Sequence, residues 1–358
     1  MIITGIPFDE KLNIGVLSKV FERKRISNCY KYFWFQAILE NIVEDKVVFT
    51  YDEILNQMIE DAWYMVTEFK LRLGPCNTTD NLEEVVKYIH SKSNISSTAK
   101  RGSVIQYLKE NTDPKIKKYK KCLIENVPYC MQINEQAHLL YYFVALEGIF
   151  SKFKINEEWV DYLIRNRTIL LEWVRYNLIG YLQDRNPNVP GIVEKIQKPE
   201  KRDLRRVSDY WKTIIEIDPK IKEIYQKVSL KDKPISIDHF VPWQYLSHDE
   251  LWNLSPTTKN INSMKGNQLP NLYEDFERLA ELQHKALMMC NDYEIVRHKF
   301  KICLDYHVNS TEIRNSLYQP DIDLPSYRER LYNVIQPVYD SAKMGGFTEW
   351  IPRKQRWK

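Results

Sequence analysis

The chain has 358 residues, of which 44% are hydrophobic and 28% are charged. This composition is typical of folded globular domains and excludes disordered, collagen-like and mucin-like proteins. Basic residues number 52 and acidic residues 48, and the resulting net charge of +4 permits a nucleic-acid partner without establishing one. Only 10 glycines are present and neither a GxGxxG nor a GxxxxGK motif occurs, so a nucleotide-binding phosphate loop is unsupported.

Helical periodicity dominates the first two thirds of the chain. Thr50 to Glu53 match a capping box, after which apolar residues recur at helical spacing as far as Val66. A second start signal at Asp80 precedes another helical pattern. Further helices are expected at residues 137–147, 156–165, 168–184, 204–214 and 221–228. The third of these ends at a cluster of prolines, asparagines and a glycine, residues 185–191.

The pattern changes after a linker-like segment at 231–234. A β-prone stretch, a second short apolar piece and a short helix follow, at residues 235–241, 252–255 and 257–265. Strand, loop, strand and helix in so short a stretch predict a small module. Long amphipathic helices then return, at residues 272–289 and 326–339.

We therefore expect a mostly α-helical protein of the α+β class, in which a helical scaffold carries a small embedded module. The first expected part is a helical domain at 1–230, which would grip substrate, dock a partner or regulate. The module occupies 231–270. A C-terminal helical region at 271–358 would pack on the module and end in a basic tail at 352–358.

The residue types in the module suit metal-assisted cleavage of a phosphodiester. Such a reaction needs a base with a pKa near neutral to activate water, and His239 is the natural choice. It also needs a hard cation to neutralise the charge that builds on the phosphate. Magnesium prefers oxygen ligands and needs only one or two protein groups, which Asp238 and Asn262 would supply.

This pattern resembles the HNH nuclease family, which has a ββα-metal active site, and its spacing is closest to the HNH domain of CRISPR effector nucleases. The resemblance implies that Asp238 and Asn262 bind Mg²⁺ or Mn²⁺ and that His239 is the general base. It also implies that Asn253 holds the loop that orients His239, and that Lys265 lies near the scissile phosphate. The third residue of the family name is here an asparagine, an accepted variant.

The resemblance covers residues 235–270 and sets one geometric condition. Asp238 and His239 are adjacent, and neighbours on a regular strand point to opposite faces. They serve one site only if the strand ends or distorts there. Pro242 cannot donate a hydrogen bond to a sheet, which agrees with a strand that stops just before it.

The resemblance implies an endonuclease that hydrolyses nucleic-acid phosphodiester bonds, with double-stranded DNA as the favoured substrate. Proteins of this layout are found in prokaryotic restriction and anti-phage defence, which is an analogy at the level of the family. Three alternatives stay open: a module that cuts RNA, a binding subunit that does not cut, and a latent nuclease that a partner ATPase or guide complex activates. Cleavage of two strands by a one-site enzyme would favour a homodimer.

Basic clusters outside the module could bind phosphates, or could be solvated helix faces. The cluster just before the module consists of Lys198, Lys201, Arg202, Arg205 and Arg206. The lysine-rich segment 115–121 has the same two interpretations, whereas the tail 353–358 could be a DNA-contacting arm or a frayed end.

The sequence predicts a cytoplasmic protein without a membrane partner. Its start lacks the basic and then apolar pattern of a signal peptide. The longest apolar run, 138–150, is too short to span a bilayer and contains Glu147. The six cysteines form no CxxC pair, so neither a zinc ribbon nor a disulfide framework is indicated.

Overall fold

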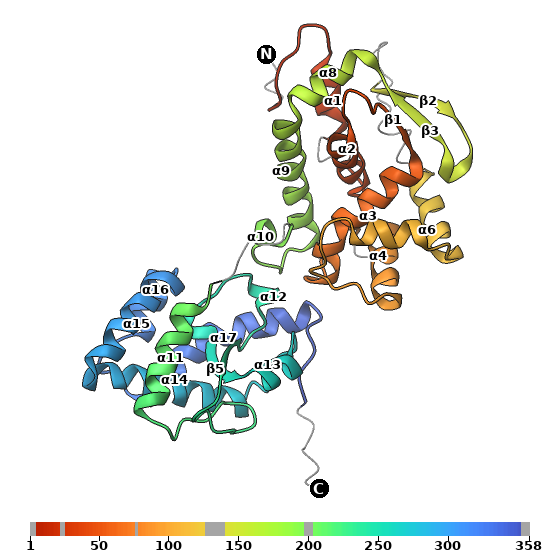
Figure 1. The fold of residues 1–358 in the computed structure, drawn as a ribbon. Helices are drawn as coiled ribbons and strands as arrows, with labels where there is room; N and C mark the ends of the chain where they lie inside the picture. Colours follow the sequence, from red (N-terminus) through yellow and green to blue (C-terminus); the bar gives the residue numbers. More distant parts are fainter. Residues whose placement is uncertain (1–4, 22–25, 76–77, 126–139, 197–202, 352–358) are drawn as a thin grey trace. The chain divides into compact units, whose positions relative to one another are not determined.

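The computed structural model describes residues 5–21, 26–75, 78–125, 140–196 and 203–351. The chain forms two compact units, one of Met1–Pro187 with Ile192–Lys198 and one of Asn188–Gly191 with Pro199–Lys358 (Figure 1). Helices dominate both units and the sheets are small and antiparallel, which confirms the expected mostly helical α+β class. No helix in the described part is long and apolar enough to cross a membrane. The expected division into three parts stays a prediction.

The first unit is built mainly from helices. They are α1 (Ile14–Val20), α2 (Tyr30–Asn41), α3 (Tyr51–Thr67), α4 (Asn81–Lys92), α5 (Ser103–Glu110), α6 (Pro114–Ile124), α8 (Glu157–Arg165), α9 (Arg167–Arg185) and α10 (Ile192–Ile196). The predicted capping box starts α3, since Thr50 Oγ1 accepts from Glu53 N and Glu53 Oε2 accepts from Thr50 N. The core of the unit centres on α2, where Tyr32, Phe33 and Trp34 are fully buried.

The sheet of the first unit corrects one prediction. Its strands β1 (Val48–Thr50), β3 (Lys152–Ile155) and β2 (Tyr141–Ala145) pair antiparallel in that order, and a short 3-10 helix η2 (Gly148–Phe150) precedes β3. The helix expected at 137–147 is therefore wrong for residues 141–145, while residues 137–139 lie outside the described part. Aromatic and β-branched side chains fit a half-buried pleated surface, and the ring centres of Tyr141 and of Phe153 in β3 lie 4.5 Å apart, with the rings tilted by 41°.

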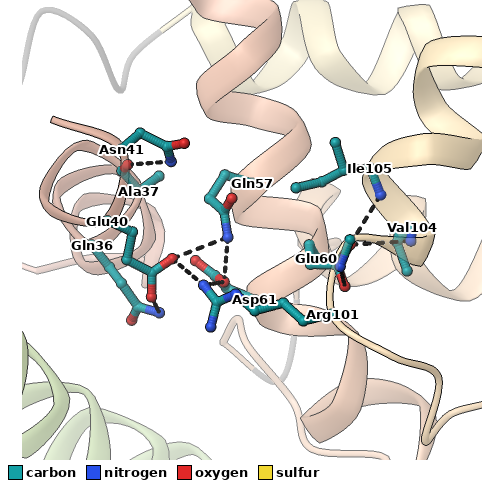
Figure 2. A network of polar contacts seen from close by, with 11 residues as sticks. Gln36, Ala37, Glu40, Asn41, Gln57, Glu60, Asp61, Arg101, Val104 and Ile105 are labelled. Carbon is teal, nitrogen blue, oxygen red and sulfur yellow. Dashed lines mark hydrogen bonds and ion pairs between the residues drawn. The ribbon is translucent and has the colours of Figure 1, made fainter. Parts of the chain in front are cut away.

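A polar network joins α2, α3 and the start of α5 (Figure 2). Gln57 Nε2 donates to Glu40 Oε2 at 3.0 Å and to Asp61 Oδ1 at 2.8 Å. Burial raises the pKa of Asp61 well above its usual value, and the nearby Glu40 charge adds to the rise. Glu60 accepts backbone N–H groups from the first turn of α5, whose N-cap is a glycine without a capping side chain. Glu60 therefore supplies the acceptors for N–H groups at the start of α5, which no capping side chain of the neighbouring sequence provides.

The second unit packs helices around a two-stranded sheet. Its elements are α11 (Arg205–Ile217), β4 (Ile235–His239), α12 (Trp243–Leu246), η3 (Leu251–Asn253), β5 (Leu254–Thr258), α13 (Lys259–Lys265), α14 (Glu274–Asp292), α15 (Glu294–His307), α16 (Thr311–Leu317) and α17 (Leu324–Met344). One continuous buried cluster includes Trp211, Phe240 and Tyr327, so α11, the β4 region and α17 share a core. The helices predicted at 204–214, 272–289 and 326–339 are confirmed.

The helix predicted at 221–228 is wrong, because this segment is a turn-rich loop. The Glu223 side chain is buried and its carboxylate accepts the backbone N–H groups of Tyr225, Gln226 and Val228, each at 2.8 Å. A carboxylate that takes several backbone donors offers the chain an alternative to helical hydrogen bonds. A β-bridge between Lys222 and Ser229 closes the loop.

Candidate active site

The strand, loop, strand and helix expected from the sequence are β4, β5 and α13. The two strands pair antiparallel, with Asp238 opposite Ser255 and His239 opposite Leu254. Helix α13 follows β5 directly because Thr258 is both the end of the strand and the N-cap, where its hydroxyl accepts from Ile261 N.

This arrangement places the three residues predicted for metal and water chemistry around one hollow. Asp238, His239 and Asn262 all line a cavity of about 150 Å³, together with residues from the start of α12 and from the end of α13. Strand β4 ends at His239. This meets the condition under which the adjacent residues Asp238 and His239 can serve one site. The structure therefore brings these side chains together, while the role of each stays a prediction.

Asp238 is held from two sides in the interior. The Tyr225 hydroxyl donates to Asp238 Oδ2, and the Lys265 ammonium lies 3.1 Å from the same oxygen. Burial, with the Asp238 charge beside it, raises the pKa of Tyr225 well above its usual value, so this hydroxyl keeps its proton. Tyr225 was not predicted as a site residue, because its segment has the sequence pattern of a helix.

Lys265 lies behind the carboxylate of Asp238. Its side chain is fully buried, and the ammonium also donates to the backbone oxygen of His239 at 2.8 Å. The described residues that line the hollow do not include Lys265. Its contacts therefore fix both members of the Asp238–His239 pair, and a contact with the scissile phosphate stays a prediction.

The imidazole of His239 is oriented by Asp249, a second residue that the sequence did not indicate. His239 Nε2 lies 2.8 Å from Asp249 Oδ1, and the His239 side chain is 7% exposed. An ionised carboxylate only accepts hydrogen bonds, so this contact with ionised Asp249 requires the proton on Nε2. The loop that carries Asp249 is itself held, since its backbone oxygen contacts His307 Nδ1 at 3.0 Å.

Asn253 fastens the chain just after His239. Its Oδ1 accepts from Val241 N at 2.7 Å and its Nδ2 donates to Val241 O at 2.8 Å, so one amide satisfies both backbone groups of one residue. Asn253 is fully buried, and its own backbone oxygen accepts from Phe240 N at 2.8 Å. These contacts hold the backbone just after His239, and the role of Asn253 in orienting His239 for catalysis stays a prediction.

Asn262 contributes the group on the helix side of the hollow. Its Nδ2 donates to Ser236 Oγ at 2.8 Å and to the Ile237 backbone oxygen at 3.2 Å. Because both hydrogens of the amide serve β4, the carbonyl oxygen Oδ1 is the atom suited to a hard cation. The donor set of one carboxylate and one amide oxygen fits Mg²⁺ or Mn²⁺, which retain several waters. No described group of three or more His, Cys, Asp or Glu residues offers a competing site.

The basic cluster before the module is only partly described. Lys198, Lys201 and Arg202 lie outside the described residues. Arg205 forms a two-pronged ion pair with Asp203, at 2.9 and 2.7 Å. The guanidinium of Arg206 stacks 3.8 Å from the centre of the Tyr306 ring. The two described arginines thus have partners within the chain, and their contact with nucleic acid stays a prediction.

One comparison with known proteins matches the part of the chain that forms this site. Residues 222–271 match a family model described as HNH endonuclease, and this span includes the Glu223 loop, β4, β5 and α13. The match identifies residues 222–271 as an HNH endonuclease domain and supports a nuclease function for that domain. Comparisons with the curated proteins and with the solved structures found no match.

Proposed function

We propose that the protein is a metal-dependent endonuclease that hydrolyses phosphodiester bonds in DNA. The observation that carries the proposal is the convergence of Asp238, His239 and Asn262 on one hollow within the span that matches the HNH family. A base, a carboxylate and an amide oxygen are the groups that water activation and a hard cation need.

His239 supplies the proton transfer. Its Nδ1 takes a proton from a water, and the water attacks phosphorus in line with the departing 3′-oxygen. Asp249 fixes the tautomer through Nε2 and stabilises the imidazolium that forms. Asn253 holds the backbone of Val241, two residues after His239, and so keeps the imidazole ring of His239 at the hollow.

Asp238 and Asn262 would hold Mg²⁺ or Mn²⁺. When bound, the cation would neutralise charge on the phosphate and on the leaving oxygen. Tyr225 and Lys265 hold the Asp238 carboxylate in one orientation, which spares the site the cost of ordering it on binding.

The test is a nuclease assay of the wild type on matched DNA and RNA strands with Mg²⁺, Mn²⁺ or chelator, beside His239→Ala. We expect metal-dependent cleavage of double-stranded DNA. The cleavage rate of the variant should be about 10²–10⁴-fold lower, which is the usual contribution of a general base. An intact cleavage rate in a folded His239→Ala protein would refute the role. If the protein cleaved RNA and not DNA, RNA would replace DNA as the proposed substrate.

The wider proposals concern setting and partners. We propose a cytoplasmic enzyme of prokaryotic restriction or anti-phage defence, which acts as a homodimer or with a partner protein such as an ATPase. A latent nuclease would be nearly inactive alone and would gain activity with a copurifying partner. The molar mass in solution and the activity of the isolated chain distinguish these arrangements.

A further inference from the structure

Helix α6 of the first unit carries lysines at five of its positions and no acidic residue. Its inner side is formed by Ile116, Leu123 and Lys120, which are buried. The Lys120 ammonium is used internally, since it lies 2.6 Å from Asp52. The remaining lysines are exposed: Lys115, Lys117, Lys118 and Lys121.

Three of these lysines form one face. At about 100° per residue, Lys117, Lys118 and Lys121 fall within about 100° of the helix circumference, opposite the buried side. We call them the α6 lysine face. Among the residues that the structure describes, none of the three forms an ion pair. Glu125, just beyond the helix, is the next acidic residue along the chain.

The ammonium groups of the α6 lysine face repel one another when no partner is bound. Lys117 and Lys121 are four residues apart and Lys118 and Lys121 three, which makes them surface neighbours at about 5–6 Å. Like charges at this spacing destabilise a helix, and α6 itself has no carboxylate to relieve them. The exposed Glu125, four residues after Lys121 at the C-cap, is a neighbour of the face but forms no ion pair with it in the described part of the chain. A polyanion that places a phosphate against each ammonium would remove the repulsion and release its own counterions.

Two aromatic rings lie near Lys115, the exposed lysine of α6 outside the face. The Lys115 ammonium lies 4.4 Å from the centre of the Tyr88 ring, and the Tyr88 and Tyr119 ring centres are 6.4 Å apart. Both tyrosines are half-buried. Ammonium groups beside partly exposed rings suit a nucleic-acid strand, whose sugars and bases lie next to its phosphates.

We propose that the α6 lysine face binds the phosphate backbone of nucleic acid, independently of sequence. This would give the first unit a substrate-gripping role that is separate from the HNH domain of the second unit. The proposal rests on the proposed function only for the choice of nucleic acid among polyanions; the charge, exposure and lack of ion pairs on α6 do not depend on it.

The test is a binding titration of the full chain in chelator, so that no cleavage is needed, with a short mixed-sequence DNA duplex at several salt concentrations. The variant is Lys117→Gln/Lys118→Gln/Lys121→Gln. Its matched control removes the same charge at exposed lysines elsewhere, as Lys11→Gln/Lys19→Gln/Lys301→Gln. Circular dichroism melting checks that both variants are folded.

We expect binding by the α6 variant to be about 10²-fold weaker at about 0.15 M salt, with a slope of log affinity against log salt shallower by about 2.7, or 0.9 for each phosphate contact. The control should keep its slope within about 1 of the wild type. Equal behaviour of the two variants would overturn the proposal. So would unchanged DNA binding by an α6 variant that loses binding to phosphatidylserine vesicles. Wild-type protein that binds through α6 but never cleaves would contradict the proposed function alone.

Discussion

The contact between Asp249 and His239 gives the sharpest prediction about catalysis. Asp249→Ala removes the carboxylate that lies 2.8 Å from His239 Nε2 and that faces a ring only 7% exposed. Without it, either nitrogen can carry the proton, and the imidazolium that forms during water activation loses its stabilising charge.

The size of the effect follows from the type of contact. A hydrogen bond to a charged group contributes about 1.5–3 kcal/mol. Since about 1.4 kcal/mol corresponds to a factor of ten, the cleavage rate of Asp249→Ala should fall about 10- to 150-fold. This loss is smaller than the one expected for His239→Ala, because the base itself is still present.

A double-mutant cycle separates a positioning role from a structural one. Asp249 acts through His239, so Asp249→Ala should cost almost nothing in a protein that already carries His239→Ala. Glu250→Ala is the matched control, because it removes a neighbouring carboxylate that contacts Asn309 and not the imidazole. Single-turnover cleavage rates at saturating Mg²⁺ supply the measurement. An equal cost of Asp249→Ala in both backgrounds would refute the reasoning.

Two further predictions concern stability. Asn253→Ala leaves the buried N–H and C=O of Val241 without the side-chain partner that they share. At about 1–3 kcal/mol for each group, hydrogen exchange in β4 and β5 should report a loss of about 2–6 kcal/mol, and unchanged protection would contradict the holding role of Asn253. Burial lowers the pKa of Lys195 from 10.5 to about 7, so the folded first unit binds fewer protons than the unfolded chain between these values and its stability rises with pH there. The advantage of Lys195→Met over wild type in urea unfolding should therefore shrink by about 1.4 kcal/mol per pH unit above pH 7, and a constant difference would contradict the burial argument.

The centre of the candidate site could be predicted because its signal is local. The intervals between Asp238, His239, Asn253 and Asn262 reflect one short strand–loop–strand–helix unit, and that unit forms as the sequence indicates. The start of α3 at Thr50 was predictable for the same reason, because a capping box needs only neighbouring residues.

The strand and the site residues that could not be predicted depend on contacts between residues far apart in the sequence. Strand β2 forms because residues 141–145 pair with β3, and that pairing outweighs the helical pattern. Tyr225 reaches Asp238 only because the Glu223 carboxylate turns the chain into a loop. Asp249 lies in an irregular loop, whose path no local periodicity fixes. Such residues become recognisable only when the fold is known.

The central claim is that His239 activates water in a metal-dependent nuclease site, and the rate of DNA cleavage with Mg²⁺ tests it most directly. Wild type and His239→Ala should be compared at equal folded concentration, with chelator as the blank. The account predicts cleavage by the wild type that chelator abolishes and that the variant performs about 10²–10⁴ times more slowly. Equal rates for the two proteins, or cleavage that persists in chelator, would contradict it.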